Sequence, residues 1–318
     1  MILTVTLNPS LDRTIEVASL DRGALIRGTA TRLDPGGKGV NVARALAEHQ
    51  IKTRAVLPLG GPDGERLLDL LTRAGIDVVA VPVQASTRSN VSLVEPDGTV
   101  TKVNEPGARL SQAEIENVVE AVLTAATGAD WVVLCGSLPP GMSADVYGRI
   151  GTALKRGGTS VAIDTSGPPL REALAACPSL VKPNREELAE AAGGPLSTLR
   201  DVLEAANGLR AQGADAVLAS LGPDGALLVE GTGATYGRSD VTSPRSTVGA
   251  GDAMLAGFLA AGGKGAAALR SALAWGAAAV TLPGSRMPNT SHLRPDDVHL
   301  FTEIDLTQHL TQHLTTPH

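Results

Sequence analysis

Short, uninterrupted apolar runs recur along this chain and are separated by longer stretches with helical periodicity. The strand-like runs are Ile2–Thr6, Arg54–Leu57, Trp131–Cys135, Ser160–Asp164, Leu180–Lys182 and Ala216–Leu221. The helical stretches between them are Asn41–His49, Glu65–Arg73, Ala144–Arg156, Pro169–Ala176 and Thr198–Gln212. A run without polar alternation is typical of a strand that is buried on both faces of a parallel sheet. The alternation therefore predicts βαβ units and a layered α/β domain.

Two further segments depart from this alternation and predict a small sheet of their own. Their antiparallel pairs are Thr14–Val17 with Ala30–Leu33, and Asn90–Glu95 with Val100–Asn104. Pro96, Asp97 and Gly98 join the second pair as a β-hairpin turn would. Such a sheet would project from the main body as a lid. Later in the chain, the Ala- and Gly-rich segment Ala250–Val280 predicts two closely packed helices that separate near Gly262.

Composition argues against several classes of partner. The 27 Lys and Arg residues and 33 Asp and Glu residues give a net charge of −6 without any basic run, which argues against nucleic acid. The longest apolar stretch, Ala253–Gly263, is too short to span a bilayer. Met1–Val5 is interpreted as a first strand, without the basic region or cleavage site of a signal peptide. The two cysteines, Cys135 and Cys177, suit a reducing compartment, so we expect a cytoplasmic protein.

The tail contains a four-residue echo, Leu306–His309 followed by Leu310–His313. On a helix, His309 and His313 would share one face and could bind a metal ion. A solvated terminal helix that frays is the favoured interpretation, and the histidines predict no metal site.

The most specific polar cluster is the segment Ser246–Met254, where two glycines flank an alanine and Asp252 follows. A helix of small residues begins here, so the free N–H groups of its first turn converge on one point. The helix dipole adds positive potential there, which suits the anionic oxygens of a phosphoryl group. Asp252 can reach the group being phosphorylated, although an aspartate at this position can also simply cap the helix. The crowded glycines favour the functional interpretation.

A second glycine-rich loop, Pro35–Arg44, also leads into a helix and contains Lys38. Its Gly-Gly-Lys-Gly run could be an ordinary surface turn. Asn41, followed by apolar residues, instead indicates a buried helix start that faces a ligand. The chain lacks a GxxxxGK[ST] motif and a GxGxxG motif that opens a helix after a strand, so neither a P-loop NTPase nor a Rossmann dehydrogenase is supported.

Polar segments follow five of the predicted buried strands. These segments begin at Asn8, Gly136, Asp164, Lys182 and Ser220. In open parallel sheets, ligands bind beyond the carboxyl ends of the strands. Each segment alone could be a routine loop, but five on the same edge predict a ligand site there.

Six motifs occur in a fixed order along the chain: Asn8–Asp12, Pro35–Asn41, Thr87–Arg88, Lys182–Asn184, Ser220–Gly222 and Thr247–Asp252. Together they resemble the ribokinase-like (PfkB) sugar kinases, in particular the branch of 1-phosphofructokinases, tagatose-6-phosphate kinases and minor 6-phosphofructokinases. The resemblance implies a three-layer α/β/α fold with a mainly parallel central sheet. It further implies a single domain over residues 1–318, with a discontinuous β lid formed by about 12–34 and 88–105.

The resemblance also implies roles for the residues on the phosphate side. Asp252 would be the catalytic base, and the amides of Gly249, Ala250 and Gly251 would stabilise the transferring phosphoryl group, as phosphoryl transfer requires. The implied ATP-binding residues are Lys182, Asn184, Ser220, Gly222 and Gly225. An Asn-x-x-Glu motif, Asn184 to Glu187, would hold Mg²⁺ through water. A monovalent cation is a further candidate cofactor.

For the acceptor, the resemblance implies a sugar site lined by Asp12, Gly37, Lys38, Asn41, Arg88 and Asn90. Asp12 and Asn41 can hold sugar hydroxyls. Lys38 and Arg88 are cations, which a sugar that already carries a phosphate needs. We therefore expect an ATP-dependent kinase that converts fructose 1-phosphate to fructose 1,6-bisphosphate.

Several alternatives remain open at this point. Tagatose 6-phosphate or fructose 6-phosphate could be the acceptor, and a kinase of neutral sugars or nucleosides would not need Lys38 or Arg88. A non-catalytic regulator that binds sugar or nucleotide is a different class, against which the retained Asp252 argues. The lid would also offer edge strands for pairing between subunits, so we expect a homodimer.

Three positions depart from the pattern of this branch. Glu105 replaces a glycine near the lid, and Pro283 replaces a polar residue near the adenine. Ala24 lies where the minor 6-phosphofructokinases have a lysine that contacts the substrate phosphate, which weakens fructose 6-phosphate as the preferred acceptor.

Overall fold

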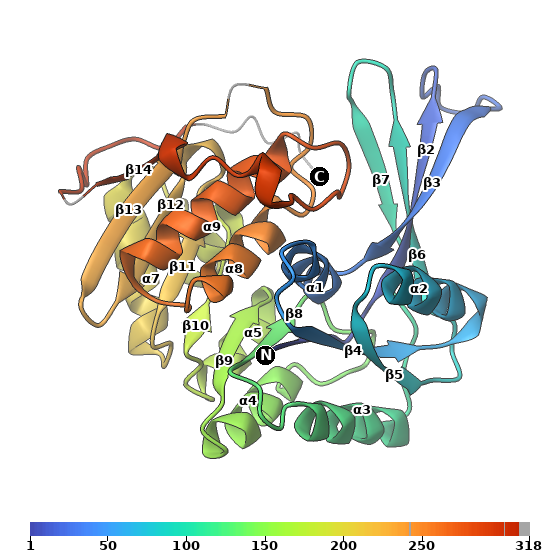
Figure 1. The fold of residues 1–318 in the computed structure, drawn as a ribbon, viewed down its shortest axis with the longest axis horizontal. Coiled ribbons are helices and arrows are strands. Elements are labelled where there is room, and N and C mark those ends of the chain that lie inside the picture. The colour runs from blue at the N-terminus through green and yellow to red at the C-terminus, as the bar shows by residue number, and fades with distance from the viewer. Residues whose placement is uncertain (242, 302, 312–318) are drawn as a thin grey trace.

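The computed structural model describes residues 1–241, 243–301 and 303–311, and within them ten strands form one large sheet (Figure 1). In spatial order they are β14 (Val298–Phe301), β13 (Gly233–Ser239), β12 (Ala226–Glu230), β11 (Val217–Ser220), β10 (Leu180–Val181), β9 (Ser160–Asp164), β8 (Trp131–Cys135), β1 (Ile2–Thr6), β4 (Thr53–Leu59) and β5 (Asp77–Pro82). The strands from β11 to β5 are parallel, and β12, β13 and β14 extend the sheet antiparallel. The prediction of a mainly parallel sheet is confirmed.

Helices cover both faces of this sheet and complete the predicted three layers. On one face lie α1 (Lys38–Glu48), α2 (Gly61–Arg73), α8 (Ala250–Ala260) and α9 (Gly265–Val280). On the other lie α3 (Gln112–Ala125), α4 (Val146–Arg156), α5 (Gly167–Leu174), α6 (Arg185–Ala192) and α7 (Leu199–Ala211). The side chains of the fully buried strands alternate between the two faces: Val132 and Leu134 of β8 pack on one, Val133 and Cys135 on the other.

A second sheet of four strands projects from this body as an arm (Figure 1). Its order is β3 (Gly28–Gly36), β2 (Ser10–Val17), β6 (Arg88–Val94) and β7 (Val100–Asn104). The two predicted antiparallel pairs are present, and β2 and β6 join them by pairing parallel. The small sheet is therefore mixed rather than wholly antiparallel.

The last described segment differs from the predicted terminal helix. Residues 305–308 form a turn, closed by a hydrogen bond of 3.1 Å from the N–H of Gln308 to the carbonyl oxygen of Asp305, and His309 then pairs with Thr198 in an isolated antiparallel bridge. At the start of α7, the N–H groups of Arg200 and Leu199 donate to the carbonyl oxygens of Leu306 and Gln308 at 3.0 and 3.1 Å. Leu310 is only 5% exposed. Because the tail buries an apolar side chain and satisfies free donors of α7, docking outweighs a solvated helix. His313 lies outside the described residues.

In the described part of the chain, no helix combines the length and the apolar character needed to cross a membrane.

Candidate functional site

Helix α8 begins with free backbone donors. Its N-cap residue, Gly249, has φ 80°, and no side chain caps this end. Within the described residues, the N–H groups of Gly249, Gly251 and Asp252 have no hydrogen-bond acceptor, whereas the N–H of Ala250 donates to the carbonyl oxygen of Thr247 at 3.3 Å. Three of the four N–H groups at this helix start are therefore available to an anion.

The backbone conformation at position 249 favours glycine. Its left-handed φ of 80° disfavours any residue with a side chain, whereas the nearest atom to an added Cβ, Cε of Met287 at 2.8 Å, is the end of a flexible side chain that could move away. The sharp turn into α8 therefore depends on glycine.

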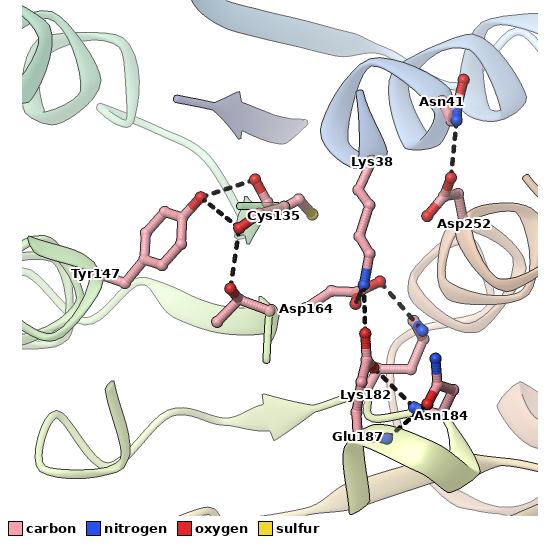
Figure 2. A network of polar contacts seen from close by, with 11 residues as sticks. Lys38, Asn41, Cys135, Tyr147, Asp164, Lys182, Asn184, Glu187 and Asp252 are labelled. Carbon is pink, nitrogen blue, oxygen red and sulfur yellow. Dashed lines mark hydrogen bonds and ion pairs between the residues drawn. The ribbon is translucent and has the colours of Figure 1, made fainter. Parts of the chain in front are cut away.

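The carboxylate of Asp252 points across the start of α8 to helix α1. Its Oδ2 accepts a hydrogen bond of 2.8 Å from Nδ2 of Asn41, and the residue is 8% exposed (Figure 2). Burial and the negative charge of Asp164 raise the pKa of Asp252 to about 6, against the opposing effects of Asn41, Lys182 and Lys38. Asp252 thus bonds to a side chain of α1 instead of capping its own helix, and it can exchange a proton near neutral pH.

A second polar cluster surrounds Asp164, the last residue of β9. Its side chain is fully buried, with Oδ1 2.7 Å from Nζ of Lys38 and Oδ2 3.1 Å from Nζ of Lys182 (Figure 2). Nζ of Lys38 also lies 3.0 Å from Oε1 of Glu187. Burial alone would raise the pKa of Asp164, but the two ammonium groups outweigh it and hold the pKa below its usual value.

Burial likewise works against the charge of Lys38, and Asp164 and Glu187 outweigh it, so the pKa of this lysine is raised. Lys38 was expected beside the acceptor. The structure instead places its ammonium group on the side of the predicted nucleotide residues. Asp164 begins one of the five polar segments that predicted a ligand site, but no specific role was predicted for it.

The start of α6 holds the predicted Asn-x-x-Glu motif in a capping box. Oδ1 of Asn184 accepts from the N–H of Glu187 at 2.7 Å, and Oε2 of Glu187 accepts from the N–H of Asn184 at 2.9 Å. Asn184 also pairs with Ser220 in an isolated parallel bridge. The Asn-x-x-Glu spacing therefore fixes the orientation of the Glu187 carboxylate, whose Oε1 faces Nζ of Lys38.

The remaining predicted ATP residues lie in the turn that follows β11. Gly222 begins the short 3₁₀ turn Gly222–Asp224, and Gly225 follows it with its carbonyl oxygen accepting from the N–H of Leu221 at 2.8 Å. The carboxylate of Asp224 accepts two hydrogen bonds from Thr311, of 2.8 and 2.7 Å. The tail therefore contacts this turn directly.

The acceptor candidates on the arm lie side by side on the parallel pair β2 and β6. Asp12 faces Asn90 in register, and Nδ2 of Asn90 donates to Oδ1 of Asp12 at 2.9 Å. The hydroxyl of Ser10 donates to the same oxygen at 2.7 Å. Burial raises the pKa of Asp12 despite these bonds. Gly36 lies beneath this carboxyl, and any Cβ there would collide with it.

Arg88, at the start of β6, holds two backbone carbonyls. Its Nη1 donates to Glu105 at 2.8 Å and its Nη2 to Asn8 at 3.0 Å. The carboxylate of Glu105 accepts from the N–H of Ser89 at 2.9 Å, so this departure from the family pattern fastens the end of the arm to β6. Burial lowers the pKa of Arg88, against the nearby charges of Asp12 and Glu105.

The structure thus brings the predicted residues into three adjoining groups. Gly249, Ala250, Gly251 and Asp252 open α8, where Asn41 joins them. Asp12, Arg88 and Asn90 lie on the arm, and Gly37 is the N-cap of α1. Lys182, Asn184, Glu187, Ser220, Gly222 and Gly225 lie where β10 and β11 end, together with Lys38.

Known proteins are similar to this chain in sequence and in fold. A 1-phosphofructokinase of Rhodobacter capsulatus is 41% identical over 263 residues, which cover 81% of this chain and 82% of that protein. An ATP-dependent 6-phosphofructokinase isozyme 2 of Mycobacterium tuberculosis is 36% identical over 308 residues, 95% and 89% of the two chains. The solved structure of phosphofructokinase-2 from Escherichia coli in complex with potassium matches with a TM-score of 0.87 and 34% identity, over 92% of this chain and 96% of that one.

The family model described as "pfkB family carbohydrate kinase" matches residues 5–292, and this span contains all three groups of site residues. The motifs, the fold and the relatives therefore agree that the chain belongs to the pfkB family of carbohydrate kinases.

Proposed function

We propose that this kinase transfers the γ-phosphoryl group of ATP to fructose 1-phosphate and releases fructose 1,6-bisphosphate and ADP. One observation carries the proposal: the buried carboxylate of Asp252 lies at the start of α8 beside three N–H groups that have no acceptor among the described residues. A base and an anion site within one helical turn suit transfer of a phosphoryl group to an alcohol. The name of the Rhodobacter relative supports fructose 1-phosphate as the acceptor.

In this mechanism Asp252 takes the proton from the free primary hydroxyl of the sugar phosphate. The oxygen then bonds to the γ-phosphorus as the bond between that phosphorus and the β–γ bridging oxygen breaks, and ADP leaves with the electron pair. The N–H groups of Gly249, Gly251 and Asp252 stabilise the charge on the transferring group. The pKa of about 6 keeps Asp252 ionised at neutral pH and able to accept the proton.

The lysine cluster suits the polyphosphate. Lys182 lies next to the start of α8, where a Cβ on Gly251 would be 3.5 Å from its Nζ, and Lys38 shares Asp164 with it. Asp164 holds both ammonium groups in place, so their positions do not depend on bound nucleotide. Such preorganised cations offset phosphate charge without reorganisation during the reaction.

Magnesium fits the carboxylate of Glu187. In the described part of the chain, no group of three or more His, Cys, Asp or Glu side chains could hold a metal ion. Mg²⁺ in kinases usually keeps several waters and binds one or two protein groups together with substrate phosphates, so one oriented carboxylate suffices. Glu187, oriented by Asn184, would hold the ion through water, and the bound ion would neutralise phosphate charge. A monovalent cation is also proposed, supported by the potassium in the Escherichia coli complex.

For the acceptor, Asp12 and Asn90 would hold sugar hydroxyls, and Arg88 would contribute positive charge toward the acceptor's existing phosphate. Fructose 6-phosphate is the second candidate acceptor, favoured by the name of the Mycobacterium relative. Tagatose 6-phosphate remains a third.

The test is an ADP-release assay with ATP, Mg²⁺ and each of fructose 1-phosphate, fructose 6-phosphate, tagatose 6-phosphate and free fructose. The highest kcat/KM is expected with fructose 1-phosphate, and free fructose should be a poor substrate. If another sugar phosphate gives the highest kcat/KM, that sugar phosphate is the acceptor instead of fructose 1-phosphate. No turnover with any sugar would favour a regulator that only binds its ligands.

We also propose that the protein is a homodimer that pairs through its arm. Strand β7 is an edge strand of the small sheet, and it exposes 46% of Val100 and 59% of Val103. Exposed apolar edge strands are typical sites of pairing between chains. Light scattering should give twice the chain mass, and a monomer mass would contradict the proposal.

A further inference from the structure

Asn41, the partner of Asp252, is itself held by an arginine one turn further along α1. Nη1 of Arg44 donates to Oδ1 of Asn41 at 3.2 Å and to the carbonyl oxygen of Pro35 at 3.2 Å. Nδ2 of the same asparagine donates to Oδ2 of Asp252 at 2.8 Å. A chain of hydrogen bonds therefore runs from the end of β3 through Arg44 and Asn41 to the proposed base.

The chemistry of these groups fixes the direction of every bond in the chain. A guanidinium has only donors, so the Asn41 atom that faces Arg44 must be its oxygen. The amide must then present its NH₂ group to Asp252. An amide turned the other way would place its oxygen against the carboxylate and leave Arg44 facing a donor.

We propose that Arg44 is a positioning residue that locks the Asn41 amide with its NH₂ group toward Asp252. The same guanidinium binds Pro35, which precedes Gly36 beneath Asp12, so it ties the sugar-binding arm to the base. Arg44 is partly buried, and burial lowers the pKa of its guanidinium against the opposing charges of Asp34 and Asp12.

Asp252 has other charged neighbours, and the test must separate Arg44 from them. Asp164 at the end of β9 repels the negative charge of Asp252, while Lys182 after β10 and Lys38 of α1 attract it. The charge of Asp252 in turn contributes to the raised pKa of the buried Cys135 thiol in β8, for which burial is the main cause. A direct charge effect of Arg44 would act whether or not Asn41 is present. An effect through the amide would vanish without Asn41.

The experiment is a double-mutant cycle with Arg44→Met and Asn41→Leu, read first by ¹³C NMR titration of the Asp252 carboxyl without substrates; Asp252→Asn identifies the signal. Arg44→Met should move the titration to higher pH, because the amide is no longer locked as a donor. In the Asn41→Leu background, Arg44→Met should have no further effect. A shift that persists in that background overturns the proposal.

Two variants control for structure and charge. Arg44→Lys retains donors only and should titrate like the wild type, so titration like the Met variant would contradict the proposal. Arg54→Met breaks the exposed ion pair between Arg54 of β4 and Asp77 of β5 and should leave the Asp252 signal unmoved. If the Met variant folds poorly, Arg44→Gln replaces it, because glutamine carries both donor and acceptor and lets the amide turn.

The kinetic readout rests on the proposed function. Arg44→Met should lower kcat about five- to tenfold at pH 6 and less than about twofold at pH 8, where the carboxylate stays ionised in both proteins. Equal losses at both pH values would indicate a merely structural role and overturn the proposal. A wild-type protein that phosphorylates no sugar would overturn the proposed function alone, because the NMR titration needs no turnover.

Discussion

Asp252, at the start of α8, and Asp164, at the end of β9, are both buried carboxyl groups of the site. Their surroundings nevertheless shift their pKa values in opposite directions. Asp252 has one neutral hydrogen-bond partner, Asn41, and its pKa is raised. Asp164 has two ammonium partners, Lys38 and Lys182, and its pKa is lowered. Burial is nearly equal, so the partners decide the result.

The opposite pKa shifts suit the two carboxyl groups to different roles. A carboxylate with a raised pKa can accept a proton, whereas one with a lowered pKa stays charged and holds cations in place. In the proposed mechanism, Asp252 at the start of α8 therefore accepts the proton, and Asp164 at the end of β9 holds the lysine charges in place.

The largest expected effect follows from removing the proposed base. Asp252→Asn keeps the shape of the side chain, and kcat should fall about 10²- to 10⁴-fold, the range of general-base catalysis. Steady-state kinetics gives kcat, and calorimetric titration should show ATP affinity within about twofold of the wild type. A kcat within tenfold of the wild type would show that Asp252 is not the catalytic base.

The complementary change at Asp164 should act mainly on stability. Asp164→Asn leaves two lysine ammonium groups beside a neutral buried amide, and loss of one partner of a buried ion pair costs about 3–5 kcal/mol. Urea unfolding at pH 7 measures the loss. The matched control is Asp77→Asn, which breaks the exposed pair with Arg54 and should cost less than about 1 kcal/mol. Equal losses would mean that Asp164 gains nothing from its lysines.

The two carboxyl groups should also give stability opposite pH dependences. Asp252 has a pKa of about 6 in the folded protein, above the ordinary aspartate value of about 3.9 that applies in the unfolded chain, so the folded state binds the proton more tightly. Its burial therefore penalises stability increasingly as pH rises from about 4 to 7, by roughly 2–3 kcal/mol. The depressed pKa of Asp164 has the reverse sign: it adds stability above the unfolded value, and this is lost as pH falls through the folded pKa.

Urea unfolding of the wild type and Asp252→Asn across this pH range measures the effect. The variant should become more stable than the wild type as pH rises, and a constant difference would contradict the raised pKa.

The smallest expected effect tests the orientation of Glu187. Asn184→Ala removes the cap of α6 and should cost about 1 kcal/mol of stability and raise the KM for MgATP. Ser111→Ala removes an equivalent capping box from α3, outside the site, and should cost a similar amount with no change in KM. If the KM for MgATP is unchanged in both variants, the orientation of Glu187 does not contribute to nucleotide binding.

Sequence patterns predicted the fold best where a strand is buried on both faces. The bounds of β1, β8 and β9 agree with the predicted runs, because continuous apolar residues leave little choice of conformation. The edge strand β5 and helix α3 were missed, although Ser111 and Glu114 form a capping box that marks the start of α3. Strands β12, β13 and β14 were missed as well, since they depend on pairing with neighbours that local pattern does not specify.

The candidate site was likewise easier to predict where its residues are adjacent in sequence. The start of α8 could be predicted because its glycines and Asp252 are adjacent in sequence. The pairing of Lys38 with Asp164 could not, because 126 residues separate them and only the completed sheet brings them together. The motif order therefore named the candidate residues, but it did not predict that Lys38 would pair with Asp164.

The parallel contact between β2 and β6 has a kinetic consequence for refolding. Asp12 and Asn90 are 78 positions apart, and α1, β4, α2 and β5 lie between them in the chain. Closing so long a loop is slow until the intervening elements have condensed. During renaturation, helical circular dichroism should therefore recover first, and discrimination between sugars should return in a separate, later phase.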